Sequence, residues 1–107
     1  MLGEIPPGSR VLPAESMNGS LVDILNTLGS QGVLQVLVEG GASVAHEFVN
    51  QGLVNRFVIY LAPVLMGGDD GAPMLRGSGA QRIDHALRGR FVSVEKVGDD
   101  LRVEVEA

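Results

Sequence analysis

The chain of 107 residues contains no cysteine and no tryptophan, and aromatic residues make up only 4% of it. Without cysteine there is no disulfide framework, no thiolate metal site and no cysteine nucleophile. One lysine accompanies seven arginines, and the net charge of −5 offers no positive surface for nucleic acid. No apolar run approaches the roughly 18 residues of a membrane span, and no secretory signal is visible. We therefore expect a cytoplasmic protein with no nucleic-acid or membrane partner.

Glycine and aliphatic residues are plentiful instead. Hydrophobic residues make up 45% of the chain, charged residues 20%, and there are 15 glycines. This balance is that of an ordinary globular protein, and the length allows one domain. We expect residues 1–107 to form a single domain with a core of Val, Leu, Ile and Ala.

The first half of the chain predicts alternating helices and strands. Residues 20–29 carry apolar side chains at helical spacing, with Ser20 as the N-cap and Gly29 as the left-handed residue that ends the helix. Residues 33–38 are a nearly continuous apolar run, typical of a strand covered on both faces. A helix over 42–51, capped by Ser43, and a strand over 57–62 would complete a right-handed βαβ unit.

The second half predicts a long glycine-rich loop over 64–80, one helical turn within 83–88, and two strands over 90–97 and 101–106. A turn at 98–100 joins these strands as a hairpin. A loop of this length is often functional. The expected fold class is α/β, with a mostly parallel sheet, helices on its faces and a carboxyl-terminal antiparallel hairpin.

The clearest local feature that carries chemistry is Glu39-Gly40-Gly41, which follows the predicted strand and opens the predicted helix. Two glycines let a ligand approach the backbone closely, and a helix amino terminus offers unpaired N–H groups to a phosphate or pyrophosphate. On local sequence alone, a tight turn that needs glycine for its backbone angles is the commoner explanation. The G-x-G-x-x-G fingerprint of an ordinary Rossmann fold is absent.

Other polar residues carry weaker signals. Glu39 would either hydrogen-bond a polar substrate or cap the amides that follow it. An isolated His46 is more often a surface residue than a ligand or base, and Asp69-Asp70 is more often a solvated turn than a cation site. No metalloprotease motif, nucleophile elbow or P-loop is present, so no metal site is expected.

A family resemblance adds to this interpretation. It rests on Gly32-Val33-Leu34-Gln35-Val36-Leu37-Val38-Glu39-Gly40-Gly41-Ala42, Phe48, Gly52-Leu53-Val54, Tyr60-Leu61-Ala62-Pro63 and Gly67-Gly68. These residues resemble the carboxyl-terminal reductase domain of the bacterial RibD family of riboflavin biosynthesis proteins, which has a dihydrofolate-reductase-like fold. The similarity covers about residues 10–106, and residues 33–68 are its specific centre.

The resemblance implies a reductase that uses NADPH to convert 5-amino-6-(5-phosphoribosylamino)uracil to its ribitylamino product. Carried over by position, Glu39 resembles a substrate-binding residue, and Gly67 and Gly68 resemble contacts from a loop near the site. No residue is assigned as catalytic. The residues that resemble the cofactor-binding segment are Gly40, Gly41, Ala42, Ser43, Val44, Ala45, His46 and Glu47.

The chain also departs from the family, because it looks like the carboxyl half of such a domain. The part expected before Met1 would supply the first sheet strands, most substrate-phosphate contacts and the basic residues that select NADPH. An apolar strand left without neighbours tends to pair with another chain, so we expect a homo-oligomer. Two alternatives stay open: a non-catalytic assembly module or truncated remnant of the reductase, and a reductase of the same fold acting on a pterin or related heterocycle.

Overall fold

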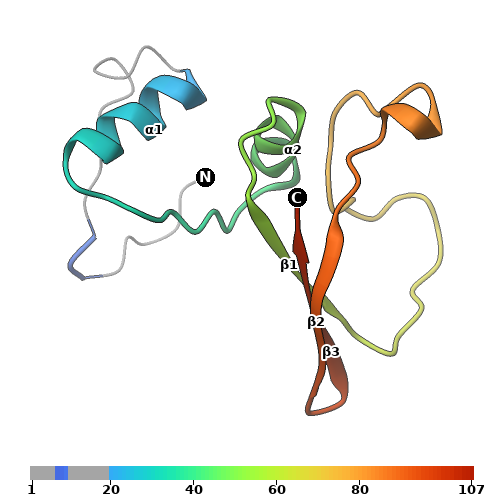
Figure 1. Cartoon of the computed structure of the whole chain (residues 1–107). Helices are drawn as coiled ribbons and strands as arrows, with labels where there is room; N and C mark the ends of the chain where they lie inside the picture. The colour runs from blue at the N-terminus through green and yellow to red at the C-terminus, as the bar shows by residue number, and fades with distance from the viewer. Residues whose placement is uncertain (1–6, 10–19) are drawn as a thin grey trace. The chain divides into compact units, whose positions relative to one another are not determined.

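The computed structural model describes residues 7–9 and 20–107, which divide into two compact units within 1–37 and 38–107. Each unit is described by itself. The first contains one described helix, and the second contains a helix, a short 3-10 helix and a three-stranded sheet (Figure 1). The α/β class expected from the sequence is confirmed at this level, while the single domain over 1–107 stays a prediction.

Helix α1 spans Leu21–Ser30, as its apolar spacing predicts. The Ser20 hydroxyl accepts a hydrogen bond from the Asp23 backbone N–H at 3.4 Å, so the predicted N-cap is confirmed. The predicted end at Gly29 is wrong, because Gly29 is still helical and Gly32 takes the left-handed conformation with φ 88°. Backbone hydrogen bonds from Gly32 to Gly29 and from Val33 to Leu28 complete a Schellman motif.

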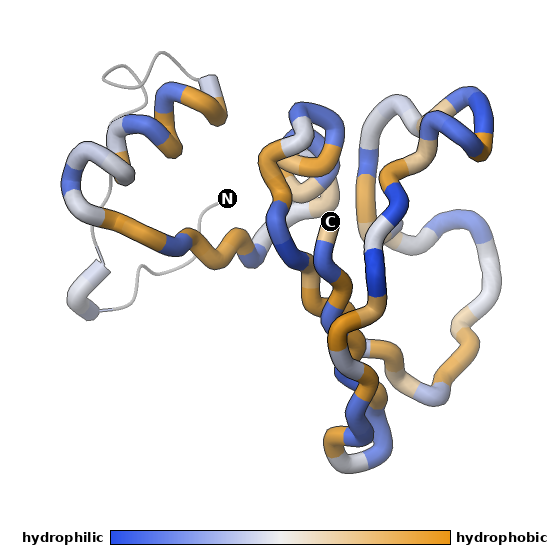
Figure 2. Tube along the Cα trace, in the orientation of Figure 1, coloured by the Kyte–Doolittle hydropathy of each residue, from blue (hydrophilic) through white to orange (hydrophobic). Residues whose placement is uncertain are grey.

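The apolar run over 33–38 does not form the predicted strand, and Figure 2 shows it as a mostly hydrophobic stretch of coil. Leu34 is fully exposed and Leu37 is 79% exposed. A strand exists only through hydrogen bonds to a neighbouring strand, and residues 20–107 provide none for this segment. The predicted βαβ unit with its parallel pairing is therefore not formed in the described part of the chain.

Helix α2 spans Ala42–Asn50, close to the predicted range. Its N-cap is Gly41, with φ 69°, and not the predicted Ser43, which lies inside the first turn and therefore cannot cap it. At the other end Gly52, with φ 68°, stops the helix as predicted, and hydrogen bonds from Gly52 to Val49 and from Leu53 to Phe48 form a second Schellman motif.

The sheet consists of β1 (Arg56–Leu61), β2 (Arg90–Val97) and β3 (Asp100–Glu106) in the order β1-β3-β2. Both pairings are antiparallel, because β3 lies between the other two strands and runs against each of them. The expected mostly parallel sheet is wrong for the described residues. The predicted hairpin of β2 and β3 is confirmed, with Gly98 at φ 60° in its tight turn.

One face of the sheet is apolar. Val105 is 7% exposed and is the one buried residue among those described, because Phe57 and Phe91 flank it in register on the neighbouring strands. Farther along the same face, Val94 is 58% exposed. The registers place these apolar residues together on this face: Phe57, Ile59, Leu61, Phe91, Val94, Leu101, Val103 and Val105.

Between β1 and β2 the chain runs as a long irregular segment over 62–89, and the 3-10 helix η2 (Ile83–His85) forms the predicted helical turn. The predicted glycine-rich loop over 64–80 is confirmed as free of helix and strand.

Candidate functional site

The turn before α2 is the centre of the candidate site, and its backbone is open. A Cβ built on Gly40 or Gly41 would meet no heavy atom within 4 Å. Gly41 has φ 69°, a conformation that side chains rarely adopt. Glycine is therefore needed at position 41 for the backbone angle, while both positions leave free space for a ligand to approach the main chain.

The first turn of α2 offers unused donors. No side chain caps the helix, and within residues 20–107 the backbone N–H groups of Ala42, Ser43 and Val44 have no hydrogen-bond acceptor. Unpaired amides at a helix amino terminus, together with the positive end of the helix dipole, favour an anion. Among the described residues, these donors are free and no atom lies within 4 Å of a Cβ built on either glycine, so the corner offers what a phosphate or pyrophosphate group requires.

The two carboxylates predicted near this corner are both exposed. Glu39 lies in the coil just before Gly40 and has no ion pair among the described residues. Glu47 accepts a hydrogen bond from the Gln51 side-chain amide at 2.9 Å, one turn farther along α2. Glu39 is therefore available to a ligand, whereas Glu47 is engaged with its own helix.

A segment of the long loop lies against α2. The Arg76 backbone N–H donates to the Ala42 carbonyl oxygen at 3.0 Å, and a Cβ on Gly77 would overlap the His46 ring. His46 is half-buried by this contact. The loop's glycine content predicts close backbone approach somewhere along it, but no local pattern singles out these two residues.

The two loop glycines expected near the site, Gly67 and Gly68, stay a prediction. Gly67 and Gly68 adopt φ angles of 69° and 81°, as sharp turns require. A Cβ on Gly67 would have no neighbour within 4 Å, and one on Gly68 would meet only the Asp70 carboxylate. Arg76 and Gly77 are the loop residues for which the structure shows contact with the helix.

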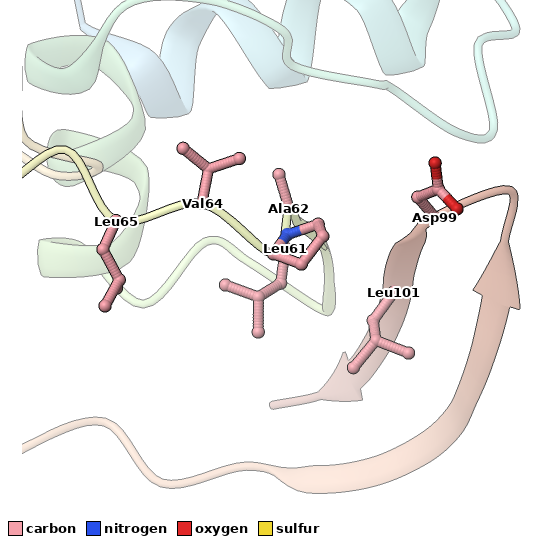
Figure 3. Close-up of a pocket in the computed structure, with 7 residues that line it drawn as sticks. Leu61, Ala62, Val64, Leu65, Asp99 and Leu101 are labelled. Atoms are coloured by element: carbon pink, nitrogen blue, oxygen red, sulfur yellow. The ribbon is translucent and has the colours of Figure 1, made fainter.

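A separate hollow of about 330 Å³ lies where β1 ends, beside the β2–β3 turn (Figure 3). Its walls are almost wholly apolar, and Asp99 is the single carboxylate at its rim. None of the predicted site residues lines it. The lining residues are Leu61, Ala62, Pro63, Val64, Leu65, Asp99 and Leu101.

Charges concentrate on the polar face of the sheet. Glu104 accepts from Arg56 at 2.7 Å and from Arg102 at 3.2 Å. The hydrogen bond from Arg102 is the main reason why the pKa of the Glu104 carboxyl lies below its ordinary value, and the same bond raises the pKa of Arg102. Arg102 also pairs with Glu95 of β2 at 3.6 Å, so this network links all three strands and contributes to the stability of the sheet.

Two further features of the described residues bear on function. Within 7–9 and 20–107, none of the helices has the length and apolar composition needed to cross a membrane. In the same residues, no three His, Asp or Glu side chains gather into a set that would hold a metal ion.

Comparison with known proteins finds relatives among riboflavin biosynthesis proteins and a pyrimidinone phosphate reductase. A family model described as the RibD C-terminal domain matches residues 10–103. The riboflavin biosynthesis protein RibD of Mycobacterium tuberculosis is 38% identical over 109 residues, which cover 97% of this chain and 31% of that protein. The 2,5-diamino-6-ribosylamino-4(3H)-pyrimidinone 5′-phosphate reductase of Methanothermobacter thermautotrophicus is 26% identical over 96% of this chain and 48% of its own length.

Solved structures agree with the sequence relatives. Acinetobacter baumannii RibD superposes with a TM-score of 0.74 at 27% identity, over 81% of this chain and 24% of that one. The chain thus spans a third or less of the RibD proteins that it matches. From the length of the family match and the identity to several relatives, the chain belongs to the RibD C-terminal domain family.

Proposed function

We propose that this chain is the cofactor-binding part of an NADPH-dependent reductase of riboflavin biosynthesis, and that the turn before α2 binds the pyrophosphate of the dinucleotide. The observation that carries the proposal is the pair of open glycines beside three unused backbone N–H groups. Family membership and the reductase among the relatives support the reaction class. The substrate would be a phosphoribosylaminopyrimidine, reduced to its ribitylamino product.

In this proposal the residues of the chain bind and orient. The amides of Ala42, Ser43 and Val44 would hold the anionic bridge, and the helix from Ala45 through Glu47 would continue the binding segment. The nicotinamide, when bound, supplies the hydride, and the accepting atom is the sugar carbon C1 in its imine or open-chain carbonyl form. Glu39, exposed at the edge of the turn, would orient or polarise the substrate there.

The test is a calorimetric titration of NADPH into the chain. We expect binding in the micromolar range, and we expect Gly41→Val to weaken it at least tenfold because a branched side chain would occupy the space of the ligand. Gly52→Val is the matched control. Gly52 has a φ of 68°, against 69° at Gly41, so valine is strained in the same way at both positions, but Gly52 lies at the opposite end of α2. No binding at millimolar NADPH would refute the proposal and favour a non-catalytic assembly module.

Three finer expectations belong to the same proposal. We propose a dihydrofolate-reductase-like fold in which residues 33–38 acquire strand neighbours from outside the described residues.

We also propose self-association through the exposed apolar sheet face, supported by Phe91, which is 72% exposed. A cytoplasmic location stays a prediction.

Self-association is tested by light scattering at micromolar concentration. We expect a dimer or a larger species, and Phe91→Glu should shift it toward the monomer by placing a charge on that face. A stable, monodisperse monomer of the unsubstituted chain would refute this part of the proposal.

A further inference from the structure

Two consecutive residues of the 62–89 segment, Arg76 and Gly77, lie against one face of α2. Arg76 donates its backbone N–H to the Ala42 carbonyl oxygen, and the next residue, Gly77, contacts the ring of His46. Ala42 and His46 are four residues apart in the helix, so they lie one above the other on the same face. Arg76 and Gly77 therefore contact two positions that lie one helical turn apart on the same face of α2.

Gly77 is the point where the loop has no room for a side chain. A Cβ built there would lie 2.8 Å from His46 Cγ and closer still to Cδ2 and Nε2. Carbon atoms in contact normally stay about 3.5–4.0 Å apart. The loop and the imidazole therefore keep these positions only while residue 77 carries no side chain. Gly79, two residues on, would accept a Cβ with no atom within 4 Å.

We infer that Gly77 is a positioning residue for the dinucleotide site. Its bare α-carbon lets the loop lie on α2, fixes the His46 ring, and keeps Arg76 hydrogen-bonded beside the first turn, where the three free amides are. The inference rests on the proposed function, because that turn is the pyrophosphate site only if the chain binds NADPH. A side chain at position 77 must rotate the His46 ring or displace the loop from the first turn of α2.

The experiment uses the whole chain and two readouts. The first needs no cofactor: NMR signals of the His46 imidazole, distinguished from His85 with the His85→Gln variant, and hydrogen exchange of the Arg76 amide. The second is the dissociation constant for NADPH. Gly77→Ala should shift the His46 signals, accelerate exchange at Arg76 and weaken NADPH binding by more than the roughly twofold change expected of an uncoupled site. Gly79→Ala is the matched control and should change none of the three.

Removal of the ring supplies the rescue. In a His46→Ala background, adding Gly77→Ala should leave the Arg76 exchange rate and the NADPH affinity within about twofold of those of His46→Ala alone, because no ring then opposes the added methyl group. If Gly77→Ala and Gly79→Ala give the same NMR spectra, the contact is absent and the inference is wrong. If the His46 signals move while NADPH affinity does not, the positioning role is wrong. If the unsubstituted chain binds no NADPH, the proposed function fails, and with it this role, although the NMR readout still decides the contact.

Discussion

Gly89, just before β2, offers the sharpest test of how the sheet is packed. A Cβ at this position would lie 2.5 Å from Val105 Cγ1 and 2.9 Å from the Glu106 carbonyl oxygen. Val105 is the buried residue of the apolar face, and the Glu106 backbone belongs to the middle strand, so neither atom moves easily. Gly89→Ala should therefore force β3 and the start of β2 apart.

The size of the effect follows from the overlap. The separation from Val105 Cγ1 is about 1 Å, and that from the Glu106 oxygen about 0.5 Å, below the shortest ordinary contact. Overpacking of this kind costs about 1–3 kcal/mol. A chain of this length has a free energy of unfolding of about 5–15 kcal/mol, so the loss is a substantial fraction of the total. For a unit of about 60–100 residues, such as 38–107, a loss of about 2 kcal/mol lowers the melting temperature by roughly 8–16 °C.

The assay is urea and thermal unfolding followed by far-ultraviolet circular dichroism. Gly79→Ala is the matched control, because its Cβ would have no neighbour within 4 Å and its φ is not positive. Gly79→Ala should leave the free energy of unfolding unchanged or raise it by up to about 1 kcal/mol, because alanine lowers the conformational entropy of the unfolded chain. If Gly89→Ala unfolds within about 0.5 kcal/mol of Gly79→Ala, Gly89 does not lie against β3 and the packing argument fails.

Three further predictions concern stability. Because the pKa of Glu104 is lowered in the folded state, its ionised form stabilises the sheet above pH 4.5, the ordinary pKa, and this contribution disappears as the pH falls through the folded pKa. Glu104→Gln should therefore flatten the decline of the free energy of unfolding, measured with urea, between pH 7 and pH 3. An unchanged slope would contradict the pairing with Arg102. Ser20→Ala should destabilise α1 by about 0.5–1 kcal/mol, the lower part of the range for N-caps because the bond is long at 3.4 Å, as amide exchange in α1 will measure. Gly52→Ala should cost about 1 kcal/mol through its positive φ, and a gain in melting temperature would exclude that conformation.

Local features were predictable from the sequence. The spacing of apolar residues placed α1, and the Ser20 cap follows from a side chain that bonds within three residues. The β2–β3 hairpin is equally local, because alternation and a glycine turn specify it together. The ends of the helices were harder to predict. Gly29 has the right residue type but stands three residues before Gly32, the left-handed residue after α1. Ser43 likewise has the right type but stands two residues after Gly41, the N-cap of α2.

Features that depend on distant residues were not predictable. The run over 33–38 has the composition of a buried parallel strand, yet a strand is defined by its neighbours, and the sequence of one segment does not identify them. For the same reason β1 was placed correctly while its antiparallel partner was missed. The contact of Gly77 with His46 is set by the path of a long loop, so only coordinates distinguish Gly77 from the other loop glycines.

The strand order also constrains how this unit folds. β3 follows β1 and β2 along the chain, yet it is the strand that both of them need, since β1 and β2 share no hydrogen bonds with each other. The hairpin closes a two-residue loop and should form within microseconds, whereas joining β1 to it requires closure of the entire intervening segment. We therefore expect β1 to lack its partner in this sheet during synthesis until β3 has emerged from the ribosome, which makes the nascent chain vulnerable to misassociation during that interval.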